Sequence, residues 1–224
     1  NNNFTLTDFT YTTCNTIDNS WELNAQLMQL NKDQAEARNL TLKFKDLPIL
    51  YLPYLSFPLS DARKSGILTP NFGSSTKRGI ELSLPYYWSI APNLDLITIP
   101  NYMDKRGLQL SNQFRFMTRH QQGETHFNFL SNDKQLNTSR TYISHKQTIN
   151  IKPDWRISLN GEYVSDNNYF EDLTTSISST SRTHLLRSIN LDHYSDYWAL
   201  NIGIDNHQIL DQSLTYNLSL IHIS

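Results

Sequence analysis

Four carboxylates stand on or beside segments with the pattern of β-strands, and they are the first candidates for chemistry in this sequence. They are Asp95, Asp154, Glu162 and Asp192. Two carboxylates that face each other across a sugar could hydrolyse a glycosidic bond. Alternatively, the four residues only contribute charge to a polar surface, as inward side chains of membrane β-barrels do without catalysis. The second interpretation is favoured, and we expect no enzyme.

Other site chemistries have weaker support. The chain has 7 His and 1 Cys, and none stands in a spacing typical of a metal site. Glycine-rich phosphate loops and nucleophile elbows are absent from the sequence. Lys and Arg number 19 against 21 Asp and Glu, so the charge of -2 gives no general attraction to nucleic acid. We therefore expect no metal, no cofactor and no nucleic-acid partner.

The composition favours strands over helices. The hydrophobic fraction is only 38%, yet aromatic residues reach 12%. The most apolar stretch runs from Leu47 to Leu59 and contains Pro48, Pro53 and Pro58, which the interior of an α-helix does not accept. No segment approaches the roughly 18 uninterrupted apolar residues of a transmembrane helix. The sequence predicts an all-β fold.

The first 60 or so residues predict short strands at 4–14, 21–30 and 37–44. In the second of these, apolar residues alternate with polar ones, which indicates a strand with one buried face. The alternating apolar residues are Trp21, Leu23, Ala25 and Leu27. The proline-rich stretch from Asp46 to Gly66 follows, and its prolines permit only extended or edge backbone. We expect the domain junction in this stretch.

From Gly79 onward the pattern changes to about eight longer strands separated by polar turns, which predicts an antiparallel meander. These strands are expected at 79–87, 93–102, 107–118, 124–131, 140–151, 155–165, 182–194 and 197–206. Apolar and polar residues alternate within them, as from Trp155 to Tyr163, and this fits an outer-membrane barrel. A soluble β-sandwich fits nearly as well. The polar connection 165–181 is expected to be an extracellular loop of a barrel or an ordinary surface loop.

A resemblance to a known family covers the middle of the chain. The segments that carry it are LPILYLPYLSFPL, RKSGILTPNFG and LPYYWSIAPNLDLITIPNYMDKRGLQLSNQFRF, which lie between Ala37 and Met117. They resemble the LptD family of lipopolysaccharide-assembly proteins. The upstream YTTC and WELNAQLMQL resemble the end of that family's periplasmic domain. Beyond Met117 the agreement is limited to strand pattern and short pieces.

The resemblance implies a fold and a function. Residues 1–62 would be the end of a periplasmic β-jellyroll, and 63–224 would be the N-terminal strands of a large outer-membrane barrel, incomplete and open. Such a protein transports lipopolysaccharide and inserts it into the outer leaflet of the outer membrane. Its partners would be an LptA-type periplasmic bridge, an LptE-type lipoprotein plug and outer-membrane lipid.

The resemblance also implies roles for particular residues. Pro70 and Pro85 match prolines that loosen the lateral gate between the first and last barrel strands of the family. By itself the single Cys14 is either a buried or inert thiol or one half of a disulfide whose partner is missing from this chain. The resemblance implies the second, because Cys14 matches a cysteine of the family that forms such a disulfide. An apolar groove for acyl chains, or simply a core, would be formed by Trp21, Leu23, Leu27, Leu40 and Leu42.

Two other functions stay open at this point. One is a different outer-membrane barrel, such as a porin or an adhesin, and the other is a soluble all-β carbohydrate-binding module. The last seven residues, LSLIHIS, resemble the translation of a sequencing-library adapter, and we expect an artificial end there.

Overall fold

The computed structural model describes residues 4–12, 21–32, 34–59, 63–174, 177–211 and 220–223. Most of these residues lie in antiparallel strands, so the expectation of an all-β fold is confirmed. The chain divides into two compact units, 1–68 and 69–224. Within the described residues, no helix is long and apolar enough to cross a bilayer.

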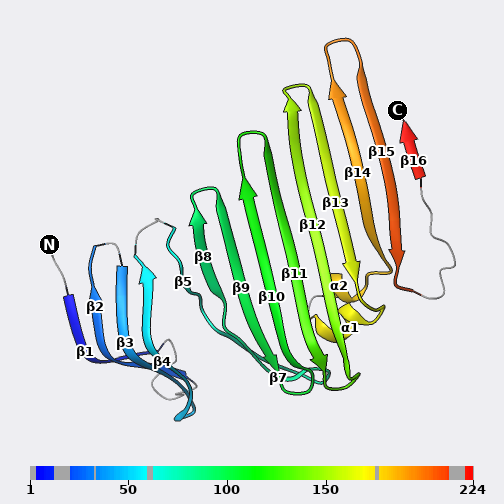
Figure 1. Ribbon diagram of the computed structural model, residues 1–224. Coiled ribbons are helices and arrows are strands. Elements are labelled where there is room, and N and C mark those ends of the chain that lie inside the picture. The colour runs from blue at the N-terminus through cyan, green and yellow to red at the C-terminus, as the bar shows by residue number, and fades with distance from the viewer. Residues whose placement is uncertain are drawn as a thin grey trace. The chain divides into compact units, whose positions relative to one another are not determined.

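The first unit is a four-stranded sheet in the order β1-β2-β3-β4 (Figure 1). The strand β4 contains Pro48, Pro53 and Pro58 and lies at the edge of this sheet, where missing amide donors are tolerated. A two-residue strand, β5, follows it in the chain. The bounds are β1 Phe4–Tyr11, β2 Trp21–Leu30, β3 Gln34–Phe44, β4 Leu47–Pro58 and β5 Gly66–Ile67.

An irregularity crosses all four strands of this sheet at one level. The residues involved are Asp8, Gln26, Asn39 and Pro53, which lie opposite one another in the continued register. Asp8 and Asn39 both have a φ of 50°, in the left-handed region that interrupts the pleat. The spacing between buried residues changes at this level. In β3 the buried residues are Ala35, Ala37, Leu40 and Leu42, at intervals of two, three and two residues.

The irregularity corrects the strict alternation expected from Trp21 to Leu27. Leu23 and Ala25 belong to the same small core as Leu40. Leu27 comes after the irregular level, and its partner across the sheet is the exposed Arg38. The period of two in β2 therefore holds only as far as Ala25, the last residue before the irregular level at Gln26.

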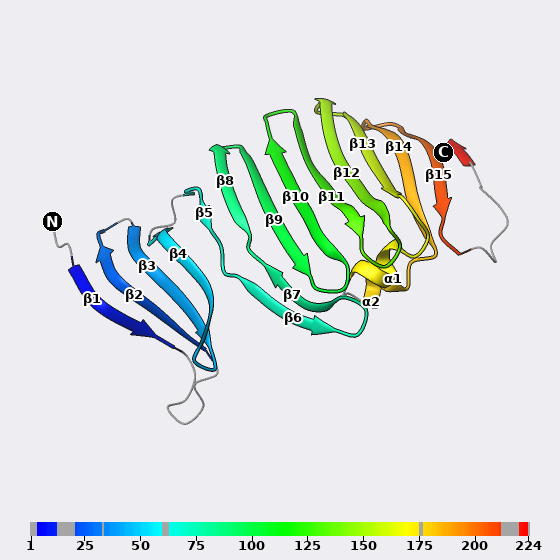
Figure 2. The same cartoon turned by 60° about the horizontal axis from the view of Figure 1, so that its bottom comes forward.

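The second unit is an antiparallel meander whose strands lie side by side in chain order from β9 to β15 (Figure 2). Its path is β16-β15-β14-β13-β12-β11-β10-β9-β7-β6, and β8 also pairs with β9. The bounds are β6 Asn71–Ser75, β7 Gly79–Ser83, β8 Tyr86–Ala91, β9 Leu94–Met103, β10 Gly107–Met117, β11 Gln121–Asp133, β12 Thr138–Lys152, β13 Trp155–Val164, β14 His184–Tyr194, β15 Ala199–Ile209 and β16 Leu220–Ile223.

The strands expected after Gly79 are observed within a few residues, with one interruption. The expected strand 79–87 is divided into β7 and β8 at Leu84 and Pro85. The expectation for the connection 165–181 was wrong in one respect, because this segment is not simply an exposed loop. It contains the helices α1 (Tyr169–Leu173) and α2 (Ile177–Thr180), and α1 buries Tyr169, Phe170 and Leu173.

The two faces of the second sheet differ in character. One face carries α1, because Gln109 of β10 donates a hydrogen bond to the Tyr169 hydroxyl at 3.0 Å. We call it the helix face. Its neighbours Leu108 and Leu110 point to the opposite face and are exposed. The register places further exposed apolar residues on that opposite face, which we call the apolar face: Phe127, Phe129, Ile143, Tyr163, Ile189 and Ile204.

Candidate functional site

The structure does not bring the four candidate carboxylates together as a catalytic pair. Asp95 of β9 accepts two hydrogen bonds from Arg115, at 2.8 and 3.0 Å from its Nε and Nη2. Glu162 of β13 is paired with Arg182. Asp154 contacts His193 and Asp192 accepts a bond from Asn201. Each carboxylate thus has its own partner. No group of three His, Cys, Asp or Glu among the described residues could hold a metal ion.

The proposed groove residues occupy different environments in the first unit. Leu40 and Leu42 are buried, and Leu23 packs against the core that contains Leu40. Leu27 lies outside this set, as described above. Trp21 begins β2 opposite Phe44, and its side chain lies outside the described part of the structure. The contiguous apolar surface of this sheet therefore runs through Leu23, Leu40 and Leu42.

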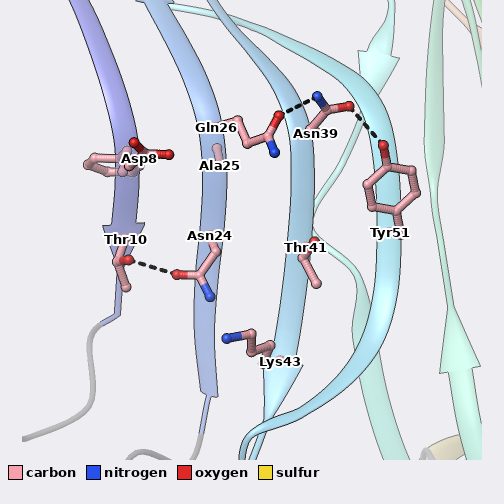
Figure 3. Close-up of a pocket in the computed structure, with 10 residues that line it drawn as sticks. Asp8, Thr10, Asn24, Ala25, Gln26, Asn39, Thr41, Lys43 and Tyr51 are labelled. Carbon is pink, nitrogen blue, oxygen red and sulfur yellow. Dashed lines mark hydrogen bonds between the residues drawn. The ribbon is translucent and has the colours of Figure 1, made fainter.

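A pocket lies on the first unit and is lined largely by polar groups (Figure 3). Asn39 Nδ2 donates to Gln26 Oε1 at 2.7 Å, and the Tyr51 hydroxyl donates to Asn39 Oδ1 at 2.8 Å. Nearby, Thr10 donates to Asn24 at 2.7 Å. These hydroxyl and amide groups are suited to water or a polar ligand rather than to an acyl chain.

An ion pair borders the same polar surface. Lys43 Nζ lies 3.0 Å from Glu22 Oε1, and Asn24 Nδ2 donates to that same oxygen at 2.9 Å. The hydrogen bonds from Asn24 and Lys43 lower the pKa of the Glu22 carboxyl, because they stabilise its charged form.

Pro70 and Pro85 both stand where strands are interrupted. Pro70 directly precedes β6, and Pro85 is buried between β7 and β8. The strands β6 and β7 pair up to Asn71 and Ser83. If that register is continued, Pro70 lies opposite Leu84, and Pro85 is the next residue. The two prolines therefore belong to one level of the sheet, just beyond the end of regular pairing.

Cys14 lies outside the described residues, so the structure gives no geometry for a disulfide. Of the last seven residues, 220–223 form β16, which pairs with β15.

A network of buried charges under α1 was not anticipated from the sequence. Arg140 is fully buried, and its guanidinium contacts Asp133, Asp166 and Asp172 at 3.1, 2.6 and 2.9 Å. Arg106 reaches the same acidic group, with its Nη1 3.0 Å from Asp133 Oδ2 and its Nη2 3.1 Å from Asp172 Oδ1. The network joins the connection that carries α1 to strand β12, to the end of β11 and to the turn between β9 and β10.

Apolar contacts hold α1 on the same face. Tyr169, Phe170 and Leu173 form a core with residues of four strands and of the segment after β15, among them Met103 and Leu185. Burial raises the pKa of the Tyr169 phenol, so its hydroxyl stays neutral and can accept the bond from Gln109. The sequence signal for this helix was the closely spaced apolar set Tyr169, Phe170 and Leu173 within a largely polar connection.

Comparisons with known proteins identify the family. The family model described as LptD protein matches residues 36–218. The chain is 36% identical over 219 residues to the LPS-assembly protein LptD of Shewanella denitrificans, covering 95% of this chain and 28% of the relative. It is 36% identical to the protein of that name from Pseudoalteromonas translucida, covering 98% of this chain and 30% of the relative. For the Azoarcus protein the identity is 38%, with 94% and 26% covered.

The chain thus spans less than a third of the length of these relatives. The matches extend well past Met117, where the resemblance noted in the sequence ended. The chain belongs to the LptD family.

Proposed function

We propose that the protein containing this chain transports lipopolysaccharide to the outer membrane and inserts it into the outer leaflet. The observation that carries this proposal is the match to relatives named LPS-assembly proteins over nearly the whole chain. Its place would be the outer membrane, with the N-terminal portion in the periplasm.

The first unit would be the end of a periplasmic jellyroll that receives the lipid. Its sheet has an apolar surface at Leu23, Leu40 and Leu42, and a polar pocket that includes Asn24 and Tyr51. The acyl chains of lipopolysaccharide are apolar and would lie along the apolar surface, since burying apolar area is favourable. The lipid would arrive from an LptA-type bridge of similar domains.

The second unit would be the N-terminal part of a barrel that further strands of the complete protein would close. Apolar side chains such as Leu108, Phe127 and Ile189 are exposed on one face, and this is the character of a lipid-facing surface. The opposite face carries charged and amide groups, which would face the lumen, the sugars and phosphates of the substrate, and an LptE-type plug.

Pro70 and Pro85 would loosen the lateral gate through which the lipid leaves. Each lacks an amide donor, and within a bilayer a strand ladder otherwise needs every donor and acceptor paired. Cys14 would form its disulfide with a cysteine of the complete protein, in the oxidising periplasm.

The proposal can be tested by depleting the complete protein from cells. We expect newly made lipopolysaccharide to stop reaching the cell surface and to accumulate inside the envelope. Expression of the wild-type protein should restore the surface signal. Normal delivery of new lipopolysaccharide after full depletion would contradict the function. Restoration by a variant with Pro70→Ala and Pro85→Ala at the wild-type rate would reject the gate assignment alone.

A further inference from the structure

A third proline, Pro100 in β9, lies at the same level as Pro70 and Pro85. Leu82 is paired with Tyr102 and Tyr86 is paired with Thr98, so the same register places Leu84 opposite Pro100. Pro70, Leu84 and Pro100 therefore lie in one row across three neighbouring strands, with Leu84 in the middle. Its strand is interior, because β9 has β10 on one side and β7 and β8 on the other. Prolines are rare in interior strands, since they interrupt a ladder.

The hydrogen bond at this position is made in one direction only. The Leu84 amide donates to the Pro100 carbonyl at 3.1 Å. In an antiparallel ladder such a pair exchanges two bonds, one from each residue. Pro100 has no N–H and cannot return a bond to the Leu84 carbonyl. The position fits the alternation of hydrogen-bonded pairs along this ladder. Four residues away, at its other end, the Asp104 amide donates to the Ile80 carbonyl at 2.9 Å.

Of the other two prolines, Pro85 weakens the neighbouring ladder at this level, and Pro70 removes a donor from the edge of the sheet. Backbone groups of successive residues point to opposite neighbours in a sheet. Because Leu84 points to β9, the missing donor of Pro85 faces the strand that contains β6. By the same alternation, the missing donor of Pro70 faces away from β7, toward the free edge. Pro100 and Pro85 thus each remove a donor from one of two consecutive ladders, and Pro70 removes a donor from the adjoining edge of the sheet.

We propose that Pro100 is a third gate residue, a positioning residue that weakens one ladder of the barrel. This ladder joins the second strand, made of β7 and β8, to the third strand, β9. This inference rests on the proposed function. The seam would then open by displacement of β6 together with β7 and β8. The reason is that a hydrogen bond is also missing between these strands and β9. Replacing Pro100 by a residue with an N–H should strengthen this ladder, because the new amide can donate the missing hydrogen bond to the Leu84 carbonyl.

The test uses the complete protein in cells with the variants Pro100→Ala, Pro85→Ala and, as a matched control, Pro153→Ala in the turn between β12 and β13. The first readout is the rate at which newly made lipopolysaccharide reaches the surface, normalised to the amount of assembled protein. The second is hydrogen exchange of the backbone around residue 100 in the purified protein. One added hydrogen bond corresponds to a change of about five-fold in a two-state equilibrium.

We expect Pro100→Ala to slow delivery about five-fold, with a slowly exchanging new amide at residue 100, and the control to match the wild type. A protected new amide with unchanged delivery would overturn the role of Pro100, and slower delivery by Pro85→Ala in the same experiment would leave the proposed function standing. An unprotected amide would overturn the structural premise. Failure of the proposed function itself would be seen differently, as normal surface delivery when the protein is depleted.

Discussion

Arg140 and Asp133 form an ion pair in which neither side chain is exposed, with 3.1 Å between Nη1 and Oδ2. Both residues also contact other charged groups, Arg140 with Asp172 and Asp133 with Arg106. Breaking a buried pair is costly because the remaining charge stays buried without its partner. The pair therefore fixes the segment with α1 to the helix face of the second sheet.

Replacing Arg140 by Leu should destabilise the protein by on the order of 3 kcal/mol, because three neighbouring carboxylates lose the guanidinium that they share. The measurement is the denaturation midpoint of the complete protein in detergent. The matched control is Lys77→Met, which removes an ion pair with Glu171 whose partners are 43% and 64% exposed. We expect the control to change stability by less than about 1 kcal/mol. Equal effects of the two variants would refute the structural weight given to Arg140.

Replacing Phe170 by Ala should release α1 from the sheet. The ring lies in the core of this unit and packs edge-on against Tyr142, with 5.3 Å between centroids. Loss of a buried phenylalanine costs about 3 to 5 kcal/mol, and here the cost falls on one short segment. Limited proteolysis of the complete protein should cut within 165–183 faster than in the wild type. A Glu171→Gln variant, altered at an exposed position of the same helix, should keep the wild-type cleavage rate.

Asn39 has a φ of 50°, which strains side chains other than Asn, Asp and Gly, and β-branched ones most. Two variants, Asn39→Gly and Asn39→Val, both remove the hydrogen bonds to Gln26 and Tyr51. Only valine adds strain, so it should be less stable than glycine by about 1 to 2 kcal/mol. Thermal unfolding of the two proteins measures the difference. Equal stability would mean that the backbone at residue 39 can relax to an ordinary strand conformation.

Because of the Glu22 carboxyl, we expect the stability of the folded protein to depend on pH. Its pKa is lower in the folded protein than in the unfolded chain, so the folded state binds this proton less readily. The resulting stability is fully present above the unfolded pKa and is lost as the pH falls through the folded pKa. In Glu22→Gln this part of the acid destabilisation should be missing. Hydrogen exchange in β2 and β3, compared for the two proteins at neutral and acidic pH, measures it.

Much of the second sheet could be predicted from the sequence, because its strands are long and their faces alternate, as from Trp155 to Tyr163. The first sheet was harder. Its irregular level shifts the phase by one residue, so a strict period of two misplaced Leu27. The spacing from Ala35 to Leu42 carries this shift in the sequence, but a left-handed residue at Asn39 is visible only in the backbone.

The contacts of α1 could not be predicted in the same way. Arg140 and Asp133 stand at either end of a hairpin, but their partner Asp172 is far away in sequence. Which charges meet depends on how the connection folds back onto the sheet. Pro100 was likewise unremarkable in the sequence, since its meaning depends on the register that sets it opposite Leu84.

The most direct test of the central claim is site-specific photo-crosslinking in living cells. A photoreactive amino acid is placed in the complete protein at Leu23, on the apolar surface of the first unit, or at its neighbour Asn24, which lines the polar pocket. If this sheet guides the acyl chains of lipopolysaccharide, crosslinked lipopolysaccharide forms at position 23 and not at position 24. Crosslinking at neither position, or to the same extent at both, would contradict the account.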